Sequence, residues 1–191
     1  MFVLKSASPR RKQILSDLGF IFHIQPEHID ESQLEKEAPL DYLDRMVHSK
    51  LGKNFEPNNV YLAADTIVVF NHQIFHKPID ELDAFRILKI LTGNIHSVYS
   101  GAAIKHLDGI EYFYEETQIQ FHNWNDQKIK DYITRCQPLD KAGSYGIQDP
   151  IGPVKEWKGS YTNVMGFPLR SFFSHHELWI RSWEERITRK G

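Results

Sequence analysis

The sequence predicts a mixed α/β fold in a single domain spanning residues 1–191, with no linker. Helical and strand-like patterns alternate along the chain, as in folds that cover a sheet with helices. Two strand-like segments, near 96–106 and 110–122, flank Asp108-Gly109, a dipeptide typical of tight antiparallel hairpins. Segment 61–70 (YLAADTIVVF) is almost continuously apolar, the pattern of a strand buried on both faces. A buried strand beside an antiparallel hairpin indicates a mixed sheet.

Capping residues and apolar spacing place the elements of the first half. A short strand over 2–4 precedes a helix in which Ser8 suits the N-cap and Pro9 the first position. We expect a second strand over 20–24 and a second helix from about Pro39. The apolar residues on one face of that second helix are Leu43, Met46, Val47 and Leu51.

The second half carries three further helix signals. Asp80 is a plausible N-cap for a helix with apolar residues at Leu82, Phe85, Leu88 and Leu91. Asn125 opens a helix to about residue 135, and the Gly- and Pro-rich segment 138–153 is expected to be a structured loop. A last helix is predicted from about Pro168. Its apolar residues recur at three- and four-residue spacing: Leu169, Phe172, Phe173, Ile180, Trp183 and Ile187.

Composition excludes several classes of protein. With 41% hydrophobic and 25% charged residues the chain is not disordered. The formal net charge of −2 argues against binding to nucleic acid through bulk charge. The single Cys136 excludes an intramolecular disulfide and a cysteine-only zinc site. Residues 1–5 do not resemble a secretory signal, and no apolar run approaches the ~18 residues of a membrane span. We therefore expect a soluble, cytoplasmic protein without membrane contact.

Segment 6–11 (SASPRR) is the first candidate site, since the usual P-loop, dinucleotide, zinc and hydrolase motifs are absent from the sequence. The segment lies between a predicted strand and helix, where free backbone N–H groups favour anions. The hydroxyl of Ser8 and the guanidinium groups of Arg10 and Arg11 would suit a phosphate. A capped surface helix with solvated arginines is the alternative, and the segment alone leaves both open.

Asp65 is the second candidate, because a carboxylate inside a buried strand is costly unless it is paired or bound to a metal. Its small neighbours Ala63 and Ala64 leave room for a ligand close to the backbone. A structural aspartate is the less favoured alternative. Together with Asp65, the pair Asp30-Glu31 would offer oxygen ligands for Mg²⁺ or Mn²⁺. Alone, such a pair is usually a solvated turn.

Two lysines and one loop complete the candidates. Lys50 lies on the apolar face of its helix, and Lys77, which precedes Pro78, could reach into a cleft. Each lysine taken singly is more often a surface residue. Segment 140–148 (DKAGSYGIQ) contains glycines that allow close approach to a ligand, and Gln148 can both donate and accept hydrogen bonds. An ordered structural loop is an equal alternative.

Taken together, these segments resemble the Maf family of nucleoside triphosphate pyrophosphatases over nearly the whole chain. The motifs are SASPRR at 6–11, IDE at 29–31, AADTIV at 63–68, KP at 77–78, LTGNIHSV at 91–98, DKAGSYGIQ at 140–148 and GSYTNVMGFPL at 159–169. The resemblance implies an elongated molecule of two lobes around a mixed sheet, with the active site in the central cleft. It also implies a homodimer that hydrolyses a nucleoside triphosphate to the monophosphate and pyrophosphate with a divalent metal.

The resemblance also implies roles for individual residues. Asp65 matches the general base, and Glu31 matches a carboxylate that helps hold the metal, Mg²⁺ or Mn²⁺, together with Asp65. Arg10, Arg11, Lys50 and Lys77 match phosphate-binding positions, to which Lys141 would add a further cation. Arg10, Thr66 and Gln148 match positions tied to base specificity. The KAGSYGIQ loop looks like that of the branch acting on dTTP and UTP.

Two departures from the family pattern bear on the cleft. Lys5 replaces a small residue and is expected to add a cation near the phosphates, and Trp157 replaces an aliphatic residue and could alter the cleft wall. Two other functions stay open: a non-catalytic nucleotide-binding regulator of cell division and septum formation, and a house-cleaning enzyme for modified nucleotides.

Overall fold

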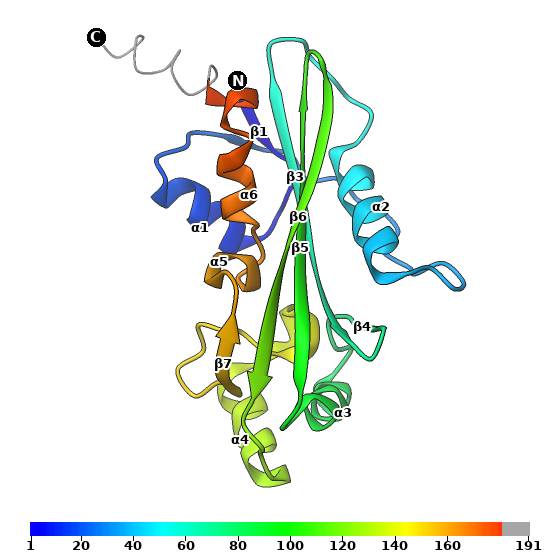
Figure 1. The fold of residues 1–191 in the computed structure, drawn as a ribbon, viewed down its shortest axis with the longest axis vertical. Coiled ribbons are helices and arrows are strands. Elements are labelled where there is room, and N and C mark those ends of the chain that lie inside the picture. Colours follow the sequence, from blue (N-terminus) through cyan, green and yellow to red (C-terminus); the bar gives the residue numbers. More distant parts are fainter. Residues whose placement is uncertain (181–191) are drawn as a thin grey trace.

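A seven-stranded mixed sheet forms the centre of the computed structural model, which describes residues 1–180 (Figure 1). Its order is β2-β1-β3-β5-β6-β7, and β4 pairs with the end of β3. The strands are β1 (Phe2–Leu4), β2 (His23–Ile24), β3 (Val60–Phe70), β4 (Gln73–Phe75), β5 (Ile95–His106), β6 (Gly109–Phe121) and β7 (Val154–Lys158). The α-helices are α1 (Pro9–Asp17), α2 (Pro39–Leu51), α3 (Glu81–Leu91), α4 (Asp126–Cys136), α5 (Tyr161–Val164) and α6 (Leu169–Ser174).

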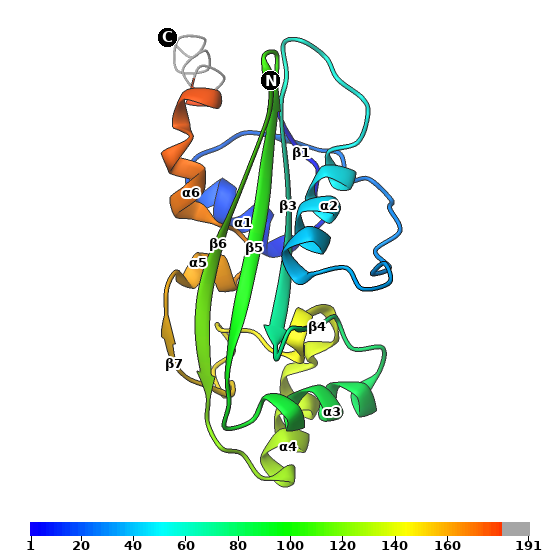
Figure 2. The same ribbon diagram turned by 45° about the vertical axis from the view of Figure 1, so that its right-hand side comes forward.

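The β5–β6 hairpin sets the length of the molecule. Its strands have 12 and 13 residues and run along the long axis in both views (Figures 1 and 2). The strands are antiparallel and meet at the Asp108-Gly109 turn, as predicted. Strand β1 is parallel to both β2 and β3, whereas β3, β5, β6 and β7 pair antiparallel. The predicted mixed α/β fold is therefore confirmed.

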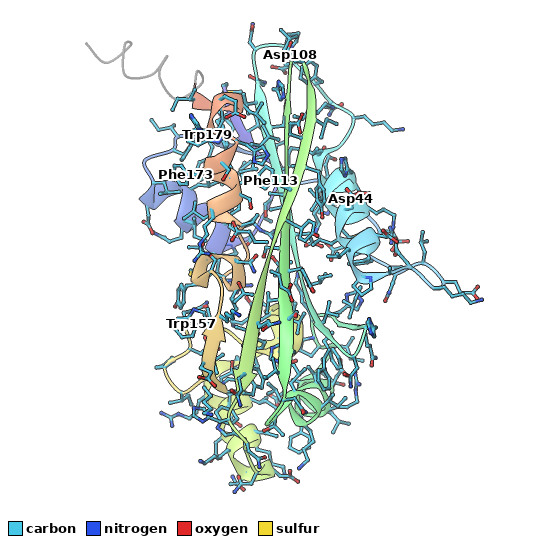
Figure 3. The ribbon with its side chains drawn as sticks, in the orientation of Figure 1. Asp44, Asp108, Phe113, Trp157, Phe173 and Trp179 are labelled. Carbon is cyan, nitrogen blue, oxygen red and sulfur yellow. The ribbon has the colours of Figure 1, made fainter. Side chains whose placement is uncertain are left out.

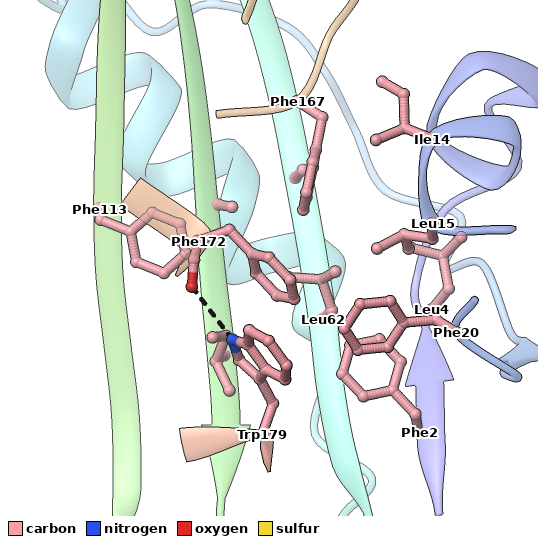
Figure 4. Packing of buried hydrophobic residues seen from close by; sticks show 13 residues of the cluster. Phe2, Leu4, Ile14, Leu15, Phe20, Leu62, Phe113, Phe167, Phe172 and Trp179 are labelled. Atoms are coloured by element: carbon pink, nitrogen blue, oxygen red, sulfur yellow. Dashed lines mark hydrogen bonds between the residues drawn. The ribbon is translucent and has the colours of Figure 1, made fainter. Parts of the chain in front are cut away.

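Helices cover both faces of the sheet. Helices α1, α5 and α6 lie on one face, α2 lies on the other, and α3 and α4 pack at the far end of the hairpin (Figures 1 and 2). On the α1 face, Phe20, Phe172 and Trp179 close an aromatic cluster over β1 and β3 (Figure 4). The α2 face and the far end contain their own apolar clusters. The sheet thus separates three packed regions.

The C-terminal helix is shorter than predicted. Helix α6 ends at Ser174 and is followed by the 3₁₀ turn His176–Leu178. The Trp179 ring stacks on Phe172 at 4.8 Å, and its indole Nε1 donates to the Phe172 carbonyl oxygen at 3.0 Å (Figure 4). This bond occupies a carbonyl that a continuing helix would use. The predicted positions Trp183 and Ile187 lie outside the described residues.

Other differences from the predictions are local. Strand β2 comprises only His23–Ile24, because Phe20 turns into the core against Phe2, with ring centroids 5.2 Å apart. In α3, Leu82 is 78% exposed, and the core side is formed by Ala84, Ile87, Leu88 and Leu91. The short elements β4, β7 and α5 were not predicted. Among residues 1–180, no helix is long and apolar enough to cross a membrane.

Candidate active site

An open stretch of sheet edge at β3 defines the candidate site. Strand β1 pairs with β3 as far as Leu62, and β4 pairs with β3 from Val68 onward. Among the described residues, therefore, no strand pairs with positions 63–67 along this edge. The chain leaves β1 through α1 on one face and enters β3 from α2 on the other (Figure 2). Such a switch beside the carboxyl end of a parallel strand is where α/β sheets bind ligands.

A cleft of about 410 Å³ opens at this edge. All the predicted site residues line it, although they come from segments far apart in the chain: Ser8, Arg10, Arg11, Glu31, Lys50, Asp65, Thr66, Lys77, Lys141 and Gln148. The cleft also has an apolar part, formed by Val68, Val98, Ala142, Tyr145, Val164 and Met165. A ligand with a polyanionic end and a flat, weakly polar end would match both parts.

Lys50 joins the two candidate carboxylates. From α2 its Nζ lies 2.7 Å from Asp65 Oδ1 and 2.8 Å from Glu31 Oε1. The Lys50 side chain is 13% exposed, which agrees with its predicted place on the apolar face of the helix. Burial pushes the pKa of Glu31 upward, but the hydrogen bond and charge of Lys50, with help from Lys77 and Arg11, hold it below its usual value. Both carboxylates therefore converge on one point of the cleft.

Arg11 is buried beneath the same point. Its Nε donates to the Gly166 carbonyl oxygen at 2.8 Å, Nη1 to Ser6 Oγ at 3.2 Å and Nη2 to Thr66 Oγ1 at 3.2 Å. Nη2 also lies 4.0 Å from Asp65 Oδ1. These bonds use three of the five guanidinium N–H groups, so two donors are left for a ligand. Arg11 thus presents an oriented cation beside the carboxylate.

The remaining cations of the cleft include two that share one carboxylate. Arg10 Nη1 donates to Asp140 Oδ2 at 3.0 Å, and Lys141 Nζ donates to Asp140 Oδ1 at 2.8 Å. Burial raises the pKa of Asp140, but Lys141 and Arg10 together hold it below its usual value. Lys77 lies in the short segment after β4, and Gln148 is exposed at the rim. Two positive groups therefore share one carboxylate.

Ser8 acts as the predicted N-cap of α1. Its Oγ accepts from the backbone N–H of Arg11 at 3.5 Å. This bond uses a lone pair of the hydroxyl and leaves its proton free to donate to an anion.

The two departures from the family pattern have different outcomes. The Lys5 side chain is fully buried, and its Nζ pairs with Glu27 Oε1 at 2.5 Å. Lys5 was expected to add a cation near the phosphates; it does line the cleft, but its charge is paired with Glu27. Trp157 lies on β7, 48% exposed and 6.0 Å from the Tyr161 ring (Figure 3). It does not line the cleft, so the expected change in the cleft wall is wrong.

Sequence reasoning missed a layer of buried polar residues behind the cleft. His96 Nε2 lies 2.8 Å from the hydroxyl of the cleft residue Tyr145. Asn163 is fully buried and bonds to Ser100 and Thr117. His96 and Asn163 lie within the motifs LTGNIHSV and GSYTNVMGFPL, which were the available signal, but their partners are distant in the sequence.

Comparison with known proteins shows clear relatives. The family model described as Maf-like protein matches residues 1–177. A protein of Leptospira biflexa serovar Patoc named dTTP/UTP pyrophosphatase is 75% identical over 190 residues, covering 100% of both chains. A Leptospira interrogans protein of the same name is 48% identical, covering 94% of this chain and 95% of its own. One from Thermosipho africanus is 40% identical, covering 95% and 92%.

Proposed function

This chain belongs to the Maf family, and on that premise we propose that it hydrolyses dTTP and UTP to the nucleoside monophosphate and pyrophosphate. Relatives at 75%, 48% and 40% identity carry the name of this activity. The observation that carries the proposal is the contact of Asp65 with Lys50, 2.7 Å apart at the open edge of β3. There an acid, a second carboxylate and several cations surround one space.

Local charge supports a triphosphate substrate. Six Lys and Arg side chains line the cleft of a protein whose formal net charge is −2: Arg10, Arg11, Lys50, Lys77, Lys141 and Lys5, the last of which is paired with Glu27. Guanidinium groups match phosphate oxygens in geometry, and ammonium groups add mobile point charges. These groups would bind the polyphosphate and stabilise the departing pyrophosphate.

The donor set fits a divalent cation. Glu31 and Asp65 contact the same Lys50 nitrogen, so both are within reach of a single ion. Among residues 1–180 no group of three or more His, Cys, Asp or Glu side chains forms a metal site. Mg²⁺ is commonly held by one or two carboxylates and completed by substrate phosphates. A bound Mg²⁺ or Mn²⁺ would polarise phosphate oxygens and make a nearby water more acidic.

Asp65 is the proposed general base. Its carboxylate would take a proton from water as the water oxygen bonds to the α-phosphorus. The bond from that phosphorus to the bridging oxygen breaks, and the electron pair leaves with pyrophosphate. Lys50 holds the Asp65 side chain in place and also contacts Glu31, and the Arg11 guanidinium lies 4.0 Å from Asp65 Oδ1. Positioning and charge stabilisation account for the rest of the catalysis.

We assign the pyrimidine base of the nucleotide to the apolar part of the cleft. Val68 and Val98, opposite each other on β3 and β5, would pack against a pyrimidine ring. Thr66 and Gln148 stand beside this part and would bond to the polar edge of the base. A homodimer in the cytoplasm, as the family resemblance implies, remains a prediction that light scattering and cell fractionation can test.

A product assay tests the function. Purified protein is incubated with dTTP or UTP in H₂¹⁸O, with Mg²⁺, with Mn²⁺ or with chelator. We expect metal-dependent release of pyrophosphate and ¹⁸O in the monophosphate, because water attacks the α-phosphorus. Nucleotide binding without turnover would instead support a regulator. Much faster turnover of modified pyrimidine or purine triphosphates than of dTTP and UTP would support house-cleaning.

A further inference from the structure

Three polar side chains and one backbone carbonyl form a continuous series of hydrogen bonds behind the cleft. Arg11 Nη2 donates to Thr66 Oγ1 at 3.2 Å, and Thr66 Oγ1 lies 2.8 Å from Ser100 Oγ. Ser100 Oγ in turn donates to the backbone carbonyl oxygen of Asn163 at 2.7 Å. Ser100 and Asn163 are both fully buried. This series of hydrogen bonds therefore links a cleft residue to the protein interior.

The direction of every bond in this series is determined. A carbonyl oxygen only accepts, so the single hydroxyl proton of Ser100 goes to Asn163. Thr66 must then be the donor in its bond to Ser100, and its lone pair receives the Arg11 N–H. One lone pair of Thr66 is left. Toward a ligand in the cleft, the Thr66 hydroxyl is thus an acceptor only.

Asn163, at the end of this series of hydrogen bonds, is itself held rigidly. Its side-chain Oδ1 accepts from the Ser100 backbone N–H at 3.1 Å, and its Nδ2 donates to the Val98 carbonyl oxygen at 3.0 Å. Nδ2 also donates to Thr117 Oγ1 at 2.9 Å. Both sides of the amide are therefore satisfied. Rotation of Ser100 to release the Thr66 proton would leave the buried Asn163 carbonyl oxygen without this partner, which is costly.

We propose that Ser100 is a specificity-determining residue, which makes Thr66 select bases with an N–H at ring position 3. The inference rests on the proposed function and deepens it. Uracil and thymine carry a proton on N3, whereas cytosine has a lone pair there. A hydroxyl that can only accept pairs with the N3–H of uracil or thymine and repels the N3 lone pair of cytosine. Thr66 shares its β3 face with Val68 of the apolar part, which places the hydroxyl beside the proposed base.

Binding of monophosphates tests this apart from catalysis. The dissociation constants of UMP and CMP are measured by calorimetry for the wild type and for Ser100→Ala. In the variant, Thr66 is released to rotate and to donate to cytosine N3. We expect the wild type to prefer UMP and the preference to fall about tenfold in Ser100→Ala. Ser97→Ala is the matched control, since its hydroxyl on the same strand bonds to Glu116 outside the cleft. It should retain the wild-type preference.

The alternative outcomes are distinct. If Ser100→Ala weakens UMP and CMP by the same factor, Ser100 is only structural and the inference is overturned. If circular dichroism shows that the variant does not fold, the dissociation constants of the wild type for UMP and for 3-deazauridine monophosphate are compared instead. The second ligand has carbon in place of N3. Binding weaker by about tenfold supports the inference, and equal binding overturns it. Absence of dTTP and UTP hydrolysis would refute the proposed function but leave this binding test intact.

Discussion

Arg10 and Asp140, which are 130 residues apart in the chain, form an ion pair of 3.0 Å between α1 and the loop on the other side of the cleft. The Arg10 side chain is 27% exposed and that of Asp140 61%, so the pair contributes little to stability. The pair instead affects the charge of the cleft, because Asp140 neutralises Lys141 as well as Arg10. A bound phosphate would compete with this carboxylate for both cations.

Replacing Asp140 by Asn should therefore improve substrate binding. We expect the KM for dTTP to fall about two- to fivefold at low ionic strength and the gain to shrink as salt is added. Steady-state kinetics over a salt series measures this. Asp131→Asn, an exposed change on α4 outside the cleft, should leave KM unaltered. A higher KM for Asp140→Asn would mean instead that Asp140 is needed to orient Arg10.

Replacing Asp65 by Asn should abolish most turnover without unfolding the protein. Loss of a general base costs about 10²–10⁴-fold in rate, and the amide keeps the shape of the side chain. Lys50 retains its contact with Glu31. Turnover of dTTP and thermal unfolding are measured for Asp65→Asn and for Asp108→Asn, which is at the exposed hairpin turn (Figure 3). Near-wild-type turnover in Asp65→Asn would refute the assignment.

Replacing Lys5 by Met should destabilise the protein through the partner it leaves behind. The buried Lys5 ammonium pairs with Glu27, whose side chain is 32% exposed. Removing one partner leaves a charge partly desolvated, at a cost of about 1–3 kcal/mol. The double variant Lys5→Met/Glu27→Gln should recover much of this loss in urea unfolding, and Lys53→Met at an exposed site should cost nothing. If the double variant is less stable than Lys5→Met, the unpaired Glu27 is not the cause.

His96 should make stability depend on pH in mildly acidic solution. Burial lowers its pKa to about 3, from the ordinary 6.5. Between these values the unfolded chain binds a proton that the folded protein does not, so stability falls as the pH drops. In His96→Phe this component is absent. The stability advantage of the wild type over His96→Phe should shrink by about 1–2 kcal/mol from pH 6.5 to 5.

Urea unfolding at several pH values measures this difference. His23→Phe on β2, an exposed position, is the control and should parallel the wild type. Parallel curves for the wild type and His96→Phe would show that His96 does not couple folding to protonation.

Several elements, and the residues that line the cleft, could be predicted before any coordinates. Asn125 and Asp80 cap α4 and α3 as expected, and Asp108-Gly109 turns the hairpin. All ten predicted site residues line one cleft. Short elements such as β7 and α5 were missed because a few residues carry too little periodicity to indicate a strand or helix.

What the sequence alone determined about this protein is its mixed α/β class, its capped helices and its hairpin, because caps, turns and alternation act between close neighbours in the chain. The candidate cleft residues came from motifs that resemble those of a family. Only the tertiary structure decided that Lys5 is neutralised by Glu27 and that the Thr66 proton is directed to Ser100. Those partners are 22 and 34 residues away. A hydrogen bond reaches about 3 Å, so the role of each polar side chain depends on which distant segments folding brings beside it.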